Sequence, residues 1–305
     1  MTRFLVRRIF EAFFALLGTS LIIFIVLHLD HLDPARGLLG KEWTPQKGAA
    51  LDAKLGLNQP VPIQYVLWLR GLVQVGGIGS VIRQALPPTL EILAMGAALA
   101  FGVAVVIASL QMRHPLSALD RVLGTITGLL SAVPGFFIGA ILLYLLAYKV
   151  ALFPASAFAS PHASFLAWLY HQILPVLALA LAVIGPWSRQ LRASMGDVAS
   201  SDYVRTARAK GVSECRIISR HVLRNALLPT ITMVGLSLPT LINTLIALEF
   251  IYGINGAGTA LIEALNSLLF ASATTVALVF ACVTVLGNLL ADLAYGLVDP
   301  RVQYR

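Results

Sequence analysis

The chain has 305 residues, 58% of them hydrophobic and only 12% charged, and its mean hydropathy is +0.84. Soluble domains carry about 25% charged residues, so this composition excludes an ordinary soluble protein and predicts an integral membrane protein. The net charge of +8 does not indicate nucleic-acid binding, because the sequence contains no separate basic domain. We expect a single membrane domain over residues 1–305.

Six apolar runs are long enough, at about 20 residues, to cross the hydrocarbon core of a bilayer as helices. The fourth run is the shortest, and its start lies between Phe165 and Ile173. The expected fold is therefore an all-α integral membrane protein with six transmembrane helices. In chain order the predicted spans are Ile9–Leu29, Pro88–Leu110, Val122–Ala147, Ile173–Trp187, Ala226–Ile251 and Thr274–Leu297.

The first span follows Arg3, Arg7 and Arg8, as the apolar run of a secretory signal peptide would. This run is too long for such a peptide, and no A-x-A-like cleavage site follows it. We interpret it as a retained span with its N-terminus in the cytoplasm, and six spans return the C-terminus to the same side. Most of the 22 Lys and Arg residues then lie inside, in agreement with the positive-inside bias of membrane proteins.

The sequence HLDHLD (His28–Asp33), at the outer end of the first span, has the chemistry of a metal site. His28 and His31 are three residues apart and share a helical face, and imidazole suits nickel or zinc. A span that meets water is also expected to become polar. We favour this second interpretation and predict no metal site.

An outer segment, residues 30–87, separates the first two spans. Thr44 followed by Pro45 is typical of a helix N-cap with proline in the first turn, and Gly56 is a helix stop signal. Pro62 begins a second, partly apolar helix. We expect a small folded element on the outer side of the membrane.

The third span contains Pro134 followed by Gly135, which predicts a kink because proline cannot donate the helical hydrogen bond. Glycines four residues apart, at 124 and 128 and at 135 and 139, permit close helix packing. Charged groups inside spans are costly and are functional candidates by default. Glu91 and Glu249, near the outer ends of their spans, join Pro134 as candidates for a translocation pathway; solvation at the span ends is the alternative.

A basic loop, residues 188–225, lies between the fourth and fifth spans. Within it, DYVRTARAKG (Asp202–Gly211) predicts a short helix, since Asp202 can cap the N-terminus and Gly211 supplies a left-handed stop. The small side chains of Ala207 and Ala209 would let a partner approach closely. From these residues alone, docking to a protein and binding to anionic lipid headgroups explain the helix equally well.

The sequence lacks motifs for catalysis or for using ATP by itself. Gly40-Lys41 does not have the spacing of a phosphate-binding loop, and GINGAG (Gly253–Gly258) favours a tight turn over a dinucleotide site. A secondary transporter would show internal repeats and midplane charges. The sequence shows neither an internal repeat nor a well-buried charge pair, which argues against that alternative. We expect this chain to be neither an enzyme nor a cofactor-binding protein.

Four blocks along nearly the whole chain carry a family resemblance. They are Arg7-Arg8 with the first span, LGLNQPVPIQYVLWL (Leu55–Leu69), ALPPTLEI (Ala85–Ile92), and DYVRTARAKG through NALLP to the terminal LVDPRVQY. The chain resembles the permease subunits of ATP-binding cassette (ABC) importers for di- and oligopeptides and nickel, especially the first permease of such systems. Gly253–Gly258 departs from the family pattern, which usually has an aromatic residue and Pro-Gly there.

The resemblance implies a type I importer fold in which a short cytoplasmic coupling helix, about Asp202–Lys210, sits in a groove of an ATPase subunit. The residues that it assigns to ATPase coupling are Asp202, Tyr203, Arg205, Thr206, Ala207, Lys210, Gly211, Leu228 and Pro229.

The same resemblance implies the partners and the location of the chain. The partners are a second, similar permease, two ATPase subunits that bind ATP and Mg²⁺, an extracytoplasmic substrate-binding protein, and membrane lipid. The location is the cytoplasmic (inner) membrane of a bacterium or archaeon. Di- or oligopeptides are the expected cargo, and nickel or a metal chelate is the alternative.

Overall fold

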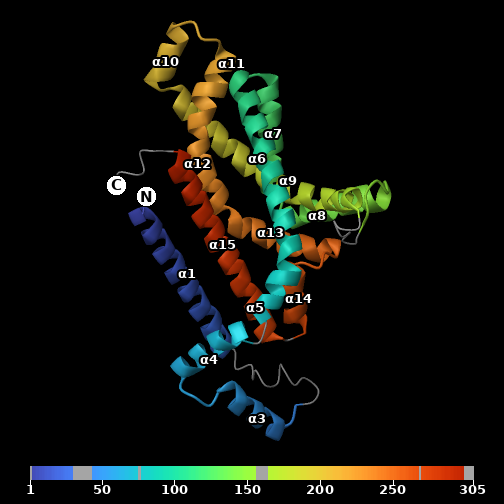
Figure 1. The fold of residues 1–305 in the computed structure, drawn as a ribbon. Coiled ribbons are helices and arrows are strands. Elements are labelled where there is room, and N and C mark those ends of the chain that lie inside the picture. Colours follow the sequence, from blue (N-terminus) through green and yellow to red (C-terminus); the bar gives the residue numbers. More distant parts are fainter. Residues whose placement is uncertain (1, 30–42, 75–76, 156–163, 268, 299–305) are drawn as a thin grey trace. The chain divides into compact units, whose positions relative to one another are not determined.

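The computed structural model describes residues 2–29, 43–74, 77–155, 164–267 and 269–298. Regular secondary structure in these ranges is helical throughout, as predicted (Figure 1). The α-helices are α1 (Thr2–Leu29), α3 (Pro45–Leu55), α4 (Val61–Gln74), α5 (Gly77–Ser80), α6 (Leu86–Arg113), α7 (Ala118–Ala132), α8 (Gly135–Leu142), α9 (Phe165–Ala199), α10 (Asp202–Ala209), α11 (Glu214–Arg216), α12 (Leu223–Leu236), α13 (Leu238–Tyr252), α14 (Ala257–Asn266) and α15 (Phe270–Val298). Wider π-helical turns form η2 (Val81–Ala85), η3 (Leu143–Lys149) and η4 (Ile217–Val222).

The chain divides into two compact units. Unit 1 contains Met1–Thr89 and Asn255–Leu286, and unit 2 contains Leu90–Ile254 and Gly287–Arg305. The single membrane domain expected from the sequence stays a prediction.

Helix α1 of unit 1 packs against α4 through a few side chains. The hydroxyls of Ser20 and Tyr65 share a hydrogen bond of 2.7 Å, and the ring of Phe24 lies 5.2 Å from that of Tyr65 and 5.7 Å from that of Trp68. Most of the side chains from Val6 to Val26 are apolar and exposed. Such a surface is favourable in hydrocarbon and unfavourable in water.

The outer element has the helix ends that its sequence predicts. The Thr44 hydroxyl accepts a hydrogen bond from the backbone N–H of Lys47 at 3.3 Å, Pro45 opens α3, and Gly56 ends it with φ of 72°. Helix α4 begins at Val61, next to Pro62. The two predicted helices are confirmed, while residues 30–42 of this segment lie outside the described residues.

The six predicted spans correspond, in order, to six helical segments. Within the described residues, four helices are individually long and apolar enough to cross a membrane: Val6–Val26, Ile78–Arg113, Phe165–Ala199 and Ser272–Leu293. Two bent pairs raise the number to six if each is one span: Ala118–Ala132 with Gly135–Lys149, and Glu214–Leu236 with Leu238–Tyr252. The fourth span begins at the earlier of its two predicted starts, and its helix continues beyond the predicted end at Trp187 to Ala199.

Helix α9 is the centre of unit 2 and packs against α7, α8, α12 and α13. Trp187, in the middle of α9, is fully buried and donates a hydrogen bond from Nε1 to the Ser237 hydroxyl at 3.1 Å. Glycine explains the close approach of α8, since a Cβ on Gly135 would lie 2.7 Å from Cβ of Ala182. Gly128 meets no described neighbour within 4 Å, so the predicted close packing holds for only one of the two glycine pairs.

The predicted kink at Pro134 is confirmed and is a complete break. Helices α7 and α8 meet there at 101°, because Pro134 cannot continue the helical hydrogen bonds and instead occupies the N-cap of α8. The break directs α8 against α9 and α13. A second bend, of 50°, separates α12 from α13 at Ser237, and the sequence analysis did not predict it.

Candidate functional site

The predicted short helix in the basic segment is present as α10, with the predicted stop. Gly211 has φ of 75°, and its N–H donates to the carbonyl of Arg208 at 2.9 Å. The N-terminus differs from the prediction, because Ser201 occupies the N-cap and Asp202 is the first helical residue. At that position the Asp202 carboxylate still lies at the positive end of the helix dipole.

Helix α10 is anchored by one side chain. Val204 is fully buried in an apolar cluster that joins the end of α9 to η4 and to α6. We name this the α10 cluster; its buried members are Ala108, Leu191, Met195, Ala199, Val204, Ile217, Ile218, Val222 and Ala226. Burying a valine completely contributes about 1.5–3 kcal/mol, so the cluster holds the inner face of α10 firmly.

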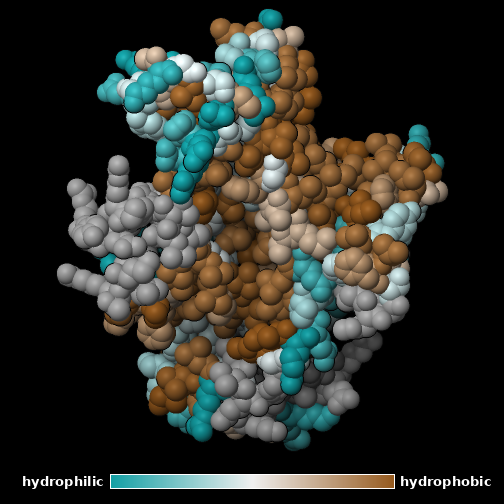
Figure 2. Space-filling view, turned by 45° about the horizontal axis from the view of Figure 1, so that its top comes forward, coloured by the Kyte–Doolittle hydropathy of each residue, from teal (hydrophilic) through white to brown (hydrophobic). Residues whose placement is uncertain are grey.

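The outer face of α10 is polar and exposed. Asp202, Tyr203, Arg205, Thr206 and Lys210 all lie on this face. Figure 2 shows polar side chains gathered over α10 and α11, in contrast to the apolar surface of α7 and α8. The segment therefore presents a basic, hydrogen-bonding surface on a fixed support.

The two alanines of α10 do not have the same role. Ala209 is exposed, as the prediction of a close partner contact requires, but Ala207 is half-buried and packs against the α10 cluster. Ala207 lies on the same side of the helix as Val204, three residues earlier, so only part of its side chain is open to a partner, and its coupling role stays a prediction.

Two side-chain contacts fix the ends of the α10 segment. The amide of Asn225 on α12 donates to the Tyr203 hydroxyl at 2.9 Å. Arg208, near the end of α10, donates to both carboxylate oxygens of Glu214, which follows Gly211 in the chain; the distances are 3.1 Å from Nε and 2.6 Å from Nη2. The hydrogen bond with Glu214 raises the pKa of Arg208, so this guanidinium remains charged.

Leu228 and Pro229, the last predicted coupling residues, lie in the interior of α12 and away from its exposed start. Leu228 is half-buried and Pro229 is exposed. The preceding Ala226 belongs to the α10 cluster, and its carbonyl accepts a hydrogen bond from the Thr230 hydroxyl at 3.1 Å. This part of α12 thus continues the support of α10.

The pathway candidates occupy three different environments. Glu91 on α6 is half-buried and accepts a hydrogen bond from Trp168 Nε1 at 3.1 Å. Pro134 is exposed at the break between α7 and α8. Glu249 on α13 is fully buried, so solvation at a span end does not describe this carboxylate.

The sequence analysis missed a partly buried ion pair beside the α10 cluster. Asp120, in the first turn of α7, is hydrogen-bonded to both Nη atoms of Arg192 on α9, with Nη2 at 2.8 Å from Oδ2. The sequence analysis did not single out Asp120. A buried carboxylate needs a partner, but no local signal identifies a partner 72 residues away.

Metal ligation receives no support from the part of the chain that the structure describes. Within it, no three His, Cys, Asp or Glu side chains are placed to hold a metal ion. His28 is near the end of α1, and residues 30–33 of the HLDHLD sequence lie outside the described residues.

Gly253 ends α13 with φ of 63°, which fits the predicted turn.

The sequence matches known families over most of its length. The family model for the binding-protein-dependent transport system inner membrane component matches residues 100–304, and the model for the N-terminal part of such components matches residues 1–89. The "probable peptide ABC transporter permease protein y4tP" of Sinorhizobium fredii is 32% identical over 311 residues, covering 99% of both chains. The "oligopeptide transport system permease protein AppB" of Bacillus subtilis is 31% identical over 317 residues, covering all of both chains. The chain belongs to the family of binding-protein-dependent transport system inner membrane components, which are the permease subunits of ABC importers.

Proposed function

We propose that this chain forms half of the translocation pathway of an importer for di- or oligopeptides and couples that pathway to ATP hydrolysis through α10. The observation that carries the proposal is the combination of a buried inner face at Val204 with an exposed, basic outer face on α10. A helix whose inner face is packed against its own subunit can pass on a displacement imposed on its outer face. The ATPase subunits are proposed to impose that displacement.

The proposed peptide cargo is supported by the two relatives named above, both of which carry peptide or oligopeptide transport in their names. Cargo selection in a binding-protein-dependent system is the task of the separate binding protein. The proposed complex contains this chain, a second similar permease, two ATPase subunits that bind ATP and Mg²⁺, and an extracytoplasmic binding protein. Both termini and α10 are proposed to lie in the cytoplasm, in agreement with the positive-inside bias.

Cysteine labelling tests this orientation at two described helix starts. Ser164 caps α9 and Ser201 caps α10. With Cys215 and Cys282 replaced, Ser164→Cys should react with a membrane-impermeant maleimide in intact cells, and Ser201→Cys only after the membrane is opened. The opposite labelling pattern would reverse the topology and remove α10 from contact with cytoplasmic ATPases.

Transport by purified complexes tests cargo and coupling together. In proteoliposomes containing both permeases and the ATPases, with the binding protein on the side opposite the ATPases, ATP should drive the accumulation of a labelled tripeptide. The Arg205→Glu change should reduce both ATPase co-purification and uptake, because it reverses a charge on the proposed docking face. Arg189→Glu reverses another exposed arginine outside α10 and is the matched control. Uptake of nickel in place of tripeptide would establish the alternative cargo, and unimpaired uptake by Arg205→Glu would refute docking through this face.

A further inference from the structure

A polar network ties three helices of unit 2 together. Asp120 on α7 is at its centre, with a side chain only 7% exposed. In addition to both Nη atoms of Arg192 on α9, its carboxylate accepts hydrogen bonds from Gln111 Nε2 on α6 at 3.1 Å and from the Leu116 N–H at 3.0 Å. We name Asp120, Arg192, Gln111 and the Leu116 N–H the Asp120 network.

The Asp120 network adjoins the α10 cluster along two shared helices. On α9, Arg192 directly follows Leu191 and lies one turn before Met195, and both of these side chains are fully buried in the cluster. On α6, Gln111 lies one turn after Ala108, another buried member. Any displacement that α10 imposes on this part of α9 therefore reaches Arg192 directly.

The cluster and the network constrain their helices differently. Apolar packing is non-directional. The cluster can therefore make α9 move together with α10 without fixing the orientation of α7. A two-pronged arginine–carboxylate pair sets both position and angle. Helix α7 contributes Asp120 to the network at one end and reaches the 101° break before α8 at the other.

We propose that Asp120 and Arg192 are a positioning pair that makes α7 move with α9 and α10 as one body when an ATPase displaces α10. This inference rests on the proposed coupling function and extends it to residues that touch neither cargo nor nucleotide. The pair carries the motion of α10 to the break at Pro134, where α8 turns against α13. Without the pair, α7 would still pack on α9 but would no longer be held at the angle that the arginine–carboxylate contact sets.

A distance measurement tests whether α7 follows α10. Spin labels are placed on the native, exposed Cys215, just beyond α10, and on Val122→Cys on the exposed side of α7, with Cys282 replaced by Ala. In the complete complex the distance between the labels should be the same without nucleotide and with ATP and vanadate. In the Asp120→Asn variant the distance should change with nucleotide, because an amide cannot replace the two-pronged ion pair.

A transport measurement distinguishes positioning from a purely structural role. The Asp120→Asn complex should retain ATP hydrolysis. It should import at least about fivefold less tripeptide per ATP hydrolysed, since fivefold is the lower end of the usual coupling between sites. Glu11→Gln makes the same chemical change in the exposed Arg7–Glu11 pair of α1 and should leave both the distance and the ratio unchanged. Asp120→Asn with a wild-type label distance and a wild-type ratio would overturn the proposal.

A second variant keeps the test decisive if Asp120→Asn does not insert into the membrane. Arg192→Lys keeps the positive charge but loses the fork geometry, and it should give an intermediate loss of tripeptide per ATP and a nucleotide-dependent label distance. Wild-type behaviour of Arg192→Lys would show that the pair serves folding alone and would overturn the inference. If the wild-type complex imports no tripeptide, the proposed cargo fails, whereas the label distances still decide the inference.

Discussion

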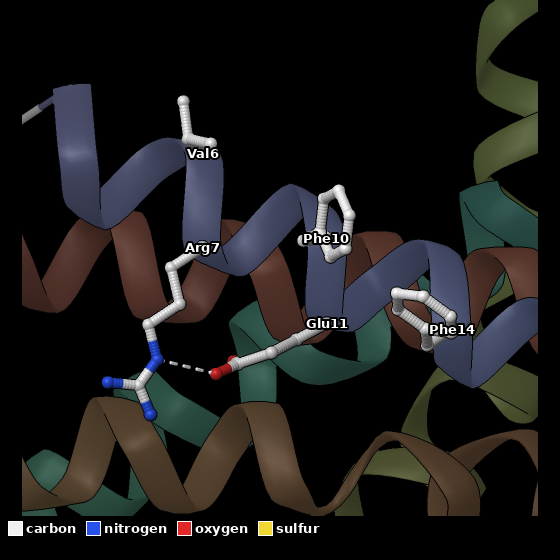
Figure 3. A pocket seen from close by; sticks show the side chains of 5 residues that line it. All are labelled: Val6, Arg7, Phe10, Glu11 and Phe14. Atoms are coloured by element: carbon white, nitrogen blue, oxygen red, sulfur yellow. Dashed lines mark hydrogen bonds and ion pairs between the residues drawn. The ribbon is translucent and has the colours of Figure 1, made fainter.

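The α10 end of unit 2 and helix α1 of unit 1 use the same residue types in opposite settings. Val204 of α10 is fully buried, whereas Val6 of α1 is 63% exposed. The α10 end contains the Asp120–Arg192 pair, in which Asp120 is buried and Arg192 is partly exposed, and α1 contains the exposed Arg7–Glu11 pair. Figure 3 shows Arg7 and Glu11 in a shallow depression whose described lining, Val6, Arg7, Phe10, Glu11 and Phe14, comes entirely from α1.

This difference separates an anchored surface, which suits the coupling role proposed for α10, from a surface that is exposed to its environment. Water and salt screen an ion pair whose two side chains are exposed. The Arg192 side chain is itself 35% exposed, but Asp120 is only 7% exposed and accepts four hydrogen bonds, so this pair constrains its helices more. The α10 end is therefore the better suited of the two to the coupling role proposed for it. The exposed side chains of α1 have the apolar character that suits lipid contact, and its charged pair contributes little to rigidity.

The largest predicted effect comes from placing a charge in the α10 cluster. Val204→Asp should abolish uptake and release the ATPase subunits, because a buried, unpaired carboxylate costs several kcal/mol and α10 would leave its support. Co-purification of the ATPases and tripeptide uptake measure this loss. The same change at the exposed Val6 should leave ATPase binding intact. Retained coupling in Val204→Asp would show that α10 does not depend on the cluster.

Local signals predicted the parts of the fold that local forces decide. The cap at Thr44, the stops at Gly56 and Gly211, and the break at Pro134 each follow from the backbone requirements of one or two residues. The inward direction of Val204 and Ala207 depends on which helices surround α10, and the sequence does not specify those neighbours. Partner choice across 72 residues, as for Asp120 and Arg192, is decided by tertiary packing alone.

A smaller effect should follow from changing the helix stop at Gly211. Its φ of 75° is unfavourable for a β-branched residue, so Gly211→Val should shift the end of α10 and reduce tripeptide uptake several-fold while the chain still inserts. Asn tolerates this backbone region better, and Gly211→Asn should transport nearly as well as the wild type. A Cβ at this position meets no described atom within 4 Å, so a steric clash with the surrounding residues would not explain the difference. Equal uptake by the Val and Asn variants would mean that the left-handed stop is not required.

The smallest effect is expected for the exposed pair on α1. Glu11→Gln removes the negative charge from the 2.8 Å ion pair between Arg7 Nε and Glu11 Oε1, where the two side chains are 80% and 45% exposed. Water and salt screen such a pair, so the melting temperature should be nearly unchanged. Thermal unfolding of the purified complex at low and high salt measures this change. A loss of stability as large as that caused by Asp120→Asn would mean that another subunit covers this face of α1. In that case α1 would also be an anchored element of the complex, and the contrast with α10 would apply to the isolated chain alone.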